Sequence, residues 1–233
     1  MIAENIASIR ARMQEAAVRA GRDPKEILLC AATKMNDADR VREAIAAGVD
    51  CCGENRVQEL VAKQAVHAYD GAPVHFIGHL QTNKVRQVVG KVALIQSVDR
   101  TELLACIERE AAKQALVQDI LLEINIGAEE SKSGFSPEQA LQIASEMAEY
   151  PHCRLRGLMA IPPVSEKPGD NCRYFEKIRT ISVDITAKKY DNIRMDCLSM
   201  GMTDDFEDAI ACGSTMIRVG TAIFGARNYN KNK

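Results

Sequence analysis

The sequence predicts an α/β fold, a single (β/α)8 barrel of the TIM type over residues 1–233. Eight apolar segments of strand length alternate with segments of helical periodicity, which is the pattern of a parallel sheet. Eight such units are the number that closes a barrel. An open doubly wound sheet is the structural alternative, but no GxGxxG pattern follows the first strand. No linker or low-complexity segment divides the chain, so one domain is expected.

The eight predicted strands are short runs rich in aliphatic residues and cysteine, bounded by polar residues, Gly or Pro. They cover residues 27–34, 49–53, 74–78, 94–98, 120–126, 155–161, 197–200 and 216–219. The first strand ends in a cation, Lys34.

Helices are predicted between the strands. Apolar residues spaced by three and four indicate an amphipathic helix over 2–20, which Gly21 ends. Asp37 or Asp39 can cap the next helix, and Ser136 followed by Pro137 opens another. Asp99 is expected to cap a helix over 99–114, and the remaining helices are expected over 54–68, 80–89, 171–187, 204–212 and 221–225.

Composition excludes two classes of partner. A net charge of −2 and a pI near 6.1 give no general attraction to nucleic acid or to an anionic membrane. No apolar run is long enough to span a bilayer, and charges interrupt residues 1–22, unlike a secretory signal. The eight cysteines form no CxxC pair, and a chain of this length needs no disulfide framework, so a reducing cytoplasm is expected.

Polar residues follow the predicted strands at their carboxyl ends, where a barrel builds its active site. We expect the following residues to converge on one mouth: Lys34, Glu54, Asn55, Gly78, His79, Asn125, Met159, Ser199, Gly201, Thr203, Arg218, Gly220 and Thr221.

The loops after the seventh and eighth strands resemble phosphate-binding loops. Each contains a glycine that permits close backbone approach, a hydroxyl group and the start of a helix, as in 199–203 and 218–221. The alternative is that Ser199, Thr203 and Thr221 are only turn and cap residues. The presence of both loops in the two expected places favours a phosphate group.

Lys34 is the candidate reactive group, because burial disfavours its charged form and an uncharged amine condenses with aldehydes. Alternatively, Lys34 is salt-bridged or reaches solvent. An amine opposite a phosphate cradle describes either a pyridoxal 5′-phosphate (PLP) site or a phosphosugar aldolase site. Arg218 favours PLP, since an arginine there could face the ring nitrogen and keep it unprotonated. The alternative for Arg218 is an ion pair with Glu54.

We expect no metal site. His75 and His79 lie four residues apart, but Gly78 separates strand from helix between them, and no third ligand shows zinc spacing. Cys51 and Cys52 are interpreted as strand thiols.

These residues give the chain its resemblance to a known family. It resembles, almost from end to end, the YggS/PROSC family of pyridoxal phosphate homeostasis proteins. The matching segments are 32–34, 53–59, 75–84, 131–134, 157–159, 198–202 and 218–225. Two departures are mild: Thr203 replaces a frequent Ser, and Met35-Asn36 replaces the usual residues after the lysine.

The resemblance implies a fold-type III PLP barrel, similar to the N-terminal domain of alanine racemase but without its C-terminal β-domain. It implies that Lys34 holds PLP as an internal aldimine and that Arg218 faces the pyridine nitrogen. It also implies that Asn55 lies beside the ring and that the phosphate is held by Ser199, Gly220 and Thr221.

The resemblance further implies a PLP carrier in vitamin B6 homeostasis rather than an enzyme. Such a carrier releases PLP by imine exchange, with PLP-dependent apo-enzymes as candidate acceptors. A weak racemase is the alternative, but a racemase needs a base on each face of Cα, and no tyrosine lies at a predicted strand end. A monomer with a frayed tail over 228–233 is expected.

Overall fold

The structure is a computed structural model that describes residues 1–129, 132–165 and 167–225. Its eight strands are parallel, pair in chain order and close into a barrel in which β8 lies beside β1. The predicted (β/α)8 barrel is therefore confirmed. The tail over 228–233 lies outside the described residues.

The strands follow the predicted order. They are β1 (Leu28–Ala32), β2 (Cys51–Glu54), β3 (Val74–Phe76), β4 (Leu94–Val98), β5 (Gln118–Ile124), β6 (Cys153–Ala160), β7 (Ile193–Ser199) and β8 (Met216–Val219).

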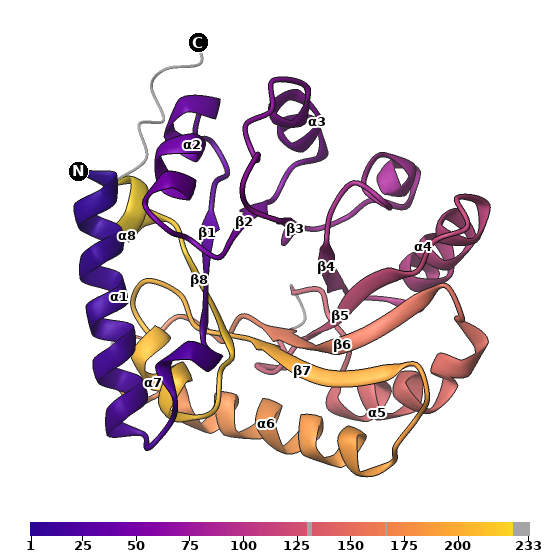
Figure 1. The fold of residues 1–233 in the computed structure, drawn as a ribbon. Helices are drawn as coiled ribbons and strands as arrows, with labels where there is room; N and C mark the ends of the chain where they lie inside the picture. The colour runs from indigo at the N-terminus through magenta and orange to yellow at the C-terminus, as the bar shows by residue number, and fades with distance from the viewer. Residues whose placement is uncertain (130–131, 166, 226–233) are drawn as a thin grey trace.

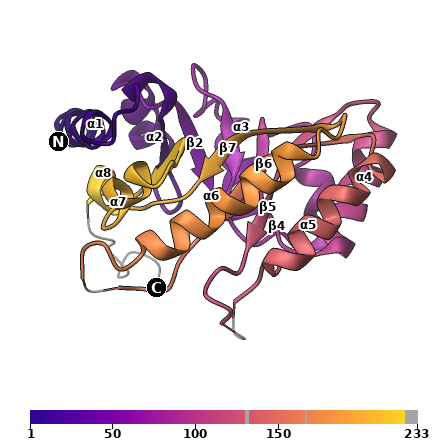
Figure 2. The ribbon, with the colours of Figure 1, turned by 90° about the horizontal axis from the view of Figure 1, so that it is seen from below.

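The helices surround the strands (Figure 1). They are α1 (Ile2–Arg19), α2 (Ala38–Ala46), α3 (Val57–Ala65), α4 (Thr101–Lys113), α5 (Pro137–Glu146), α6 (Cys172–Ala187), α7 (Phe206–Ala211) and α8 (Thr221–Phe224), with 3-10 turns η1 (Pro24–Glu26), η2 (Thr82–Gln87) and η3 (Met147–Glu149). Helix α1 lies against α2, α7 and α8, and α6 runs along β6 and β7 beside α5 (Figures 1 and 2). In the described part of the chain, no helix combines the length and apolarity that crossing a membrane requires.

Two helix starts form as their sequences predict. Asp37 caps α2 by accepting a hydrogen bond from the Arg40 N–H. Ser136 and Gln139 form a reciprocal capping box at the start of α5, with Pro137 in the first turn. These caps depend only on neighbouring residues, which explains why the sequence predicts them.

Strands β5, β6 and β7 begin earlier than predicted, at Gln118, Cys153 and Ile193. The added residues include Asp119, Arg154 and Asp196, whose charges interrupt the apolar runs and are typical of loops. They pair across the strands instead: Asp119 Oδ1 and Oδ2 lie 2.6 Å from Arg154 Nε and Arg156 Nη1, and Arg156 Nε lies 2.8 Å from Asp196 Oδ1. Opposite charges on adjacent strands stabilise the sheet.

Three helix predictions were wrong in detail. The helix over 80–89 is the 3-10 turn η2, in a segment whose valines are β-branched and poor helix formers. The helix over 54–68 begins only at Val57, because Glu54 belongs to β2. Asp99 does not cap α4, since its carboxylate contacts Arg100 and His79 instead.

The core has two parts because side chains alternate along each strand. Leu29 and Ala31 belong to the larger cluster between strands and helices, whereas Cys30 between them belongs to a smaller cluster. That smaller cluster, which we call the sulfur-rich cluster, contains Cys30, Cys51, Leu94, Leu121, Met159, Cys197 and Met216. It lies inside the barrel and contains five sulfur atoms, where many barrels have aliphatic residues.

Candidate functional site

Lys34 and the loop after β8 lie at the same end of the barrel. The register pairs Ala31 with Val219, and a Cβ built on Gly220 would lie 3.4 Å from the Cβ of Ala32. Lys34 is two residues beyond Ala32. The turn that bears the lysine and the start of α8 are therefore neighbours on one rim.

Lys34 is half-buried and lies in a turn just beyond β1. The next residue, Met35, has a φ of 61°, a left-handed conformation that is uncommon outside glycine. The turn is held by the Met35 N–H, which donates to Glu59 Oε2 at 2.7 Å, and by Asn36 Nδ2, which donates to the Lys34 carbonyl at 3.1 Å. The Met35 N–H and the Asn36 side chain thus fix the backbone around the lysine.

A buried charge cluster lies directly beneath this turn. Glu54 is fully buried, and its Oε1 accepts hydrogen bonds from Lys63 Nζ at 2.6 Å, Thr33 Oγ1 at 2.6 Å and Tyr69 Oη at 2.9 Å. Lys63 Nζ also donates to the Thr33 carbonyl at 2.8 Å. The cluster therefore joins β2 and α3 to the residue that precedes Lys34.

Arg218 lies inside the barrel below the rim, 5% exposed. Its Nη1 donates to the Ser199 carbonyl at 2.7 Å and to Ser199 Oγ at 2.6 Å, and its Nη2 donates to the Ala160 carbonyl at 3.0 Å. Burial lowers the pKa of this guanidinium. Arg218 is therefore held by neutral oxygens of β6 and β7, and not by the ion pair with Glu54 that was the alternative.

Ser199 continues a chain of buried polar groups. Its hydroxyl donates to Gln96 Oε1 at 2.6 Å, and Gln96 Nε2 lies 2.9 Å from His75 Nδ1 and 3.1 Å from Met216 Sδ. Burial lowers the pKa of His75 to about 4, so its imidazole is neutral. Because Gln96 Nε2 is a donor, Nδ1 accepts and the proton is on Nε2. The predicted role of Ser199 at a phosphate stays a prediction, since its hydroxyl is bonded to Arg218 and Gln96.

Asn55 follows β2, and Gly78 fixes its position. A Cβ built on Gly78 would lie 2.3 Å from the Asn55 carbonyl oxygen, so only glycine permits this approach. Asn55 Oδ1 is buried and has no hydrogen-bond partner within the described residues. A buried amide oxygen without a partner is costly, and a ligand at this rim can satisfy it.

The two loops that were predicted to bind phosphate, after β7 and after β8, differ in the contacts that shape their backbones. Gly201 has a φ of 95°, and a Cβ there would lie 2.6 Å from the Cβ of Ala209, so glycine is required. The Met202 N–H donates to Asp205 Oδ1 at 2.7 Å. At the other loop, Gly220 precedes α8, and Thr221 is exposed at its first position. The first N–H groups of a helix lack intrahelical partners and favour anions.

Two residues of the predicted polar set serve other contacts. His79 Nδ1 lies 3.0 Å from Asp99 Oδ2, and Asn125 Nδ2 donates to the carbonyls of Glu129 and Lys132 within its own loop. Glu123, which the sequence did not single out, is half-buried near this end of β5. Burial and the nearby Asp99 raise the pKa of Glu123 to about 7.

Gln96 and His75 were also missed as members of a network. The available signal was a polar residue in the middle of the apolar run 94–98. Sequence alone did not show that Gln96 meets Ser199, 103 positions away.

Comparisons with known proteins identify the family of this chain. The family model described as the N-terminal domain of alanine racemase matches residues 2–228. A pyridoxal phosphate homeostasis protein of Escherichia coli (strain K12) is 43% identical over 235 residues, covering 99% of this chain and 98% of its own.

Two solved structures are similar over nearly their full lengths. An unknown protein from Bifidobacterium adolescentis has a TM-score of 0.90 and 38% identity, covering 96% of this chain and 94% of its own. PipY of Synechococcus elongatus, solved with PLP bound, has a TM-score of 0.83 and 32% identity, covering 97% and 100%. The chain therefore belongs to the family of the alanine racemase N-terminal domain, and within it to the group of the pyridoxal phosphate homeostasis proteins.

Proposed function

We propose that this protein binds PLP through Lys34 and acts as a PLP carrier in vitamin B6 homeostasis, not as an enzyme. The observation that carries the proposal is the juxtaposition on one rim of the Lys34 turn and the Gly220–Thr221 loop. The likeness to PipY, whose structure was solved with PLP bound, supports it. When bound, PLP supplies an aldehyde that condenses reversibly with amines.

The residues present fit this cofactor. Lys34 supplies the amine, the loops that begin at Ser199 and Gly220 supply backbone N–H groups for a phosphate, and Thr221 supplies a hydroxyl donor. The unpartnered buried oxygen of Asn55 can accept a hydrogen bond from a polar group of the ring system. These contacts use groups at the ends of four strands, β1, β2, β7 and β8, so one small molecule could join them.

Arg218 supports a carrier over an enzyme. Its guanidinium is oriented by three hydrogen bonds to Ser199 and Ala160, so it can be presented to the pyridine nitrogen without reorganisation. A fixed cation there keeps that nitrogen unprotonated and weakens the ring as an electron sink. Weak electron withdrawal slows proton removal at Cα while leaving amine exchange possible.

The racemase alternative needs a second acid or base opposite Lys34. Tyr69 is a poor candidate, because its hydroxyl donates to the buried carboxylate of Glu54. Burial and Glu54 raise the pKa of Tyr69 well above its ordinary value. We therefore expect PLP to leave by exchange with an incoming amine, such as the active-site lysine of a PLP-dependent apo-enzyme.

We further propose that the carrier is monomeric and works in the cytoplasm. All eight cysteines are free, which suits a reducing compartment. A monomer leaves the rim open to the amine that receives PLP.

Borohydride reduction of the PLP-loaded protein tests the site. We expect a pyridoxyl group on the peptide that contains Lys34, and loss of the PLP absorbance band and of the adduct in Lys34→Ala. Lys25→Ala, which removes an exposed lysine at η1, is the matched control and should keep both. A pyridoxyl group on another peptide, with an intact band in Lys34→Ala, contradicts the assignment.

A stereochemical assay separates carrier from racemase. The loaded protein is incubated with L-alanine in deuterated solvent, and both deuterium at Cα and the D-enantiomer are measured over time. We expect neither to accumulate catalytically. Turnover that disappears in Lys34→Ala would establish the racemase alternative.

A further inference from the structure

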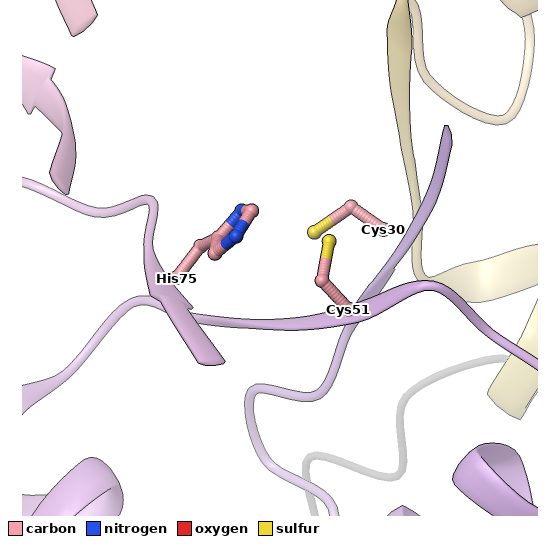
Figure 3. A group of neighbouring side chains, drawn as sticks. All are labelled: Cys30, Cys51 and His75. Carbon is pink, nitrogen blue, oxygen red and sulfur yellow. The ribbon is translucent and has the colours of Figure 1, made fainter. Parts of the chain in front are cut away.

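Three potential metal ligands meet inside the barrel, below the proposed PLP site. They are Cys30 on β1, Cys51 on β2 and His75 on β3, and their ligand atoms all lie within 4.8 Å of one another. Figure 3 shows both thiols and the imidazole directed into the same space. All three side chains are buried, at 0%, 1% and 7% exposure.

The surroundings of these three residues are rich in soft donors. Cys30 and Cys51 belong to the sulfur-rich cluster together with Met159, Cys197 and Met216. Thiolate, thioether and imidazole are the ligands that thiophilic ions prefer over Mg²⁺ or Ca²⁺. Spacing along the chain did not predict this set, because its members come from three neighbouring strands and not from one short motif.

Gln96 can give His75 the support that a metal-binding histidine requires, once its amide is turned. His75 Nδ1 lies 2.9 Å from the Gln96 amide, which leaves Nε2 as the nitrogen available to a ligand. Metal-bound histidines usually donate their other N–H to an oxygen acceptor. A half-turn of the Gln96 amide would place Oε1 where Nε2 is now and provide that acceptor.

We propose that Cys30, Cys51 and His75 form a binding site for a thiophilic divalent ion, with Zn²⁺ as the best chemical match. On binding, two S–H bonds break, two protons leave to solvent and the two sulfurs donate their electron pairs to the ion. The His75 proton moves from Nε2 to Nδ1. No oxidation or reduction occurs, and the ion with two thiolates is electrically neutral in the barrel interior.

The geometry requires only a small contraction. Tetrahedral zinc with Zn–S bonds near 2.3 Å and Zn–N bonds near 2.1 Å separates its ligand atoms by about 3.5–3.8 Å. The ligand atoms lie within 4.8 Å of one another, so side-chain rotations that move them by roughly 1 Å reach the spacing of a zinc site. Met216, which belongs to the same buried cluster as Cys30 and Cys51, offers a soft sulfur for the fourth position.

Metal binding displaces protons from thiol ligands. A hydrogen bond with Cys30 and burial raise the pKa of Cys51 well above its ordinary value. Metal binding should therefore release protons at neutral pH, which gives a direct signal. Cys30 is also paired in register with Arg218, so the ion would lie near the guanidinium that Ser199 and Gln96 help to orient.

Titration of the reduced, full-length protein with Zn²⁺ and Co²⁺, without PLP, tests the proposal. We expect one ion per chain, a thiolate-to-cobalt charge-transfer band, and release of about two protons per Zn²⁺ in calorimetry across buffers of different ionisation enthalpy. In a second arm the protein is refolded in the presence of Zn²⁺, because the ion could enter the closed barrel of the folded protein only slowly.

Cys51→Ser should abolish this binding, and Gln96→Leu should weaken it by about 10–100-fold through its effect on His75. Cys106→Ser, at a half-buried cysteine of α4, is the matched control and should bind as the unmodified protein does. Circular dichroism verifies that each variant is folded, and Cys51→Ala replaces Cys51→Ser if it is not.

Two results would overturn the proposal. One is that the unmodified protein binds no ion in either arm. The other is binding that survives in Cys51→Ser but is lost in Cys172→Ser, which would place the ion where Cys172, at the start of α6, meets Cys212, just after α7. Neither result affects the Lys34 assignment, whose pyridoxyl adduct is measured separately.

Discussion

Replacing Glu54 by leucine tests what holds the backbone beneath Lys34. The carboxylate is fully buried and is the only anion within 3 Å of Lys63 Nζ among the described ion pairs. Its removal leaves a buried ammonium with a carbonyl and the more distant Glu59 at 3.4 Å. Breaking a buried pair by removing one partner costs about 3–5 kcal/mol. For a chain of this size that corresponds to a fall in Tm of roughly 6–20 °C.

The double variant Glu54→Leu/Lys63→Met separates the ion pair from the rest of the cluster. Removing both charges should restore most of the lost stability, because an apolar pair of similar volume can match a buried salt bridge. Tyr69 then loses its acceptor, at a cost of about 1–3 kcal/mol. Thr33 loses less, because its hydroxyl also donates to the Gly53 carbonyl at 3.1 Å. Adding Tyr69→Phe, which removes the unpaired hydroxyl, should restore most of the stability that the double variant still lacks.

Urea unfolding monitored by circular dichroism gives the free energies of unfolding of the unmodified protein and of the single, double and triple variants. We expect Glu54→Leu to be less stable than the double variant by about 2 kcal/mol or more, with m-values unchanged. Equal stability of the two would mean that the charge on Lys63 is not what Glu54 compensates, and the reasoning would be wrong.

Two further variants test packing and titration. In Gly157→Ala the new Cβ would lie 1.7 Å from the Cys197 carbonyl oxygen, at a φ of 150°, and the free energy of unfolding in urea should fall by about 2–6 kcal/mol. Gly169→Ala has a φ of 84° and no atom within 4 Å of its new Cβ, so it should lose only about 1–2 kcal/mol. An equal loss in both variants would refute the clash at Gly157. Because the pKa of Glu123 is about 7 when folded and 4.5 ordinarily, the folded state holds the extra proton, and stability should fall as pH rises through this window. Glu123→Gln should therefore gain up to about 3 kcal/mol over the unmodified protein between pH 5 and pH 8. Glu102→Gln, at an exposed position, is the matched control, and an equal gain in it would contradict the assignment to Glu123.

Residues close together in the chain were the ones whose structure could be predicted. Asp37 and Ser136 cap their helices because a cap needs only its own first turn. The charged starts of β6 and β7 were not recognised as strand, because Arg154 and Asp196 look like loop residues until Asp119 and Arg156 are placed beside them. Pairing of this kind depends on neighbours that local pattern does not supply.

The sequence by itself determined the alternation of strands and helices, the barrel it closes, and the position of Lys34 at the end of the first strand. Apolar periodicity acts over a few residues, so it can be seen along the chain. Only the tertiary structure decided that Gln96 joins Ser199 to His75 and that Cys30, Cys51 and His75 share one space. These contacts depend on the stagger between strands, which is fixed when the sheet closes on itself.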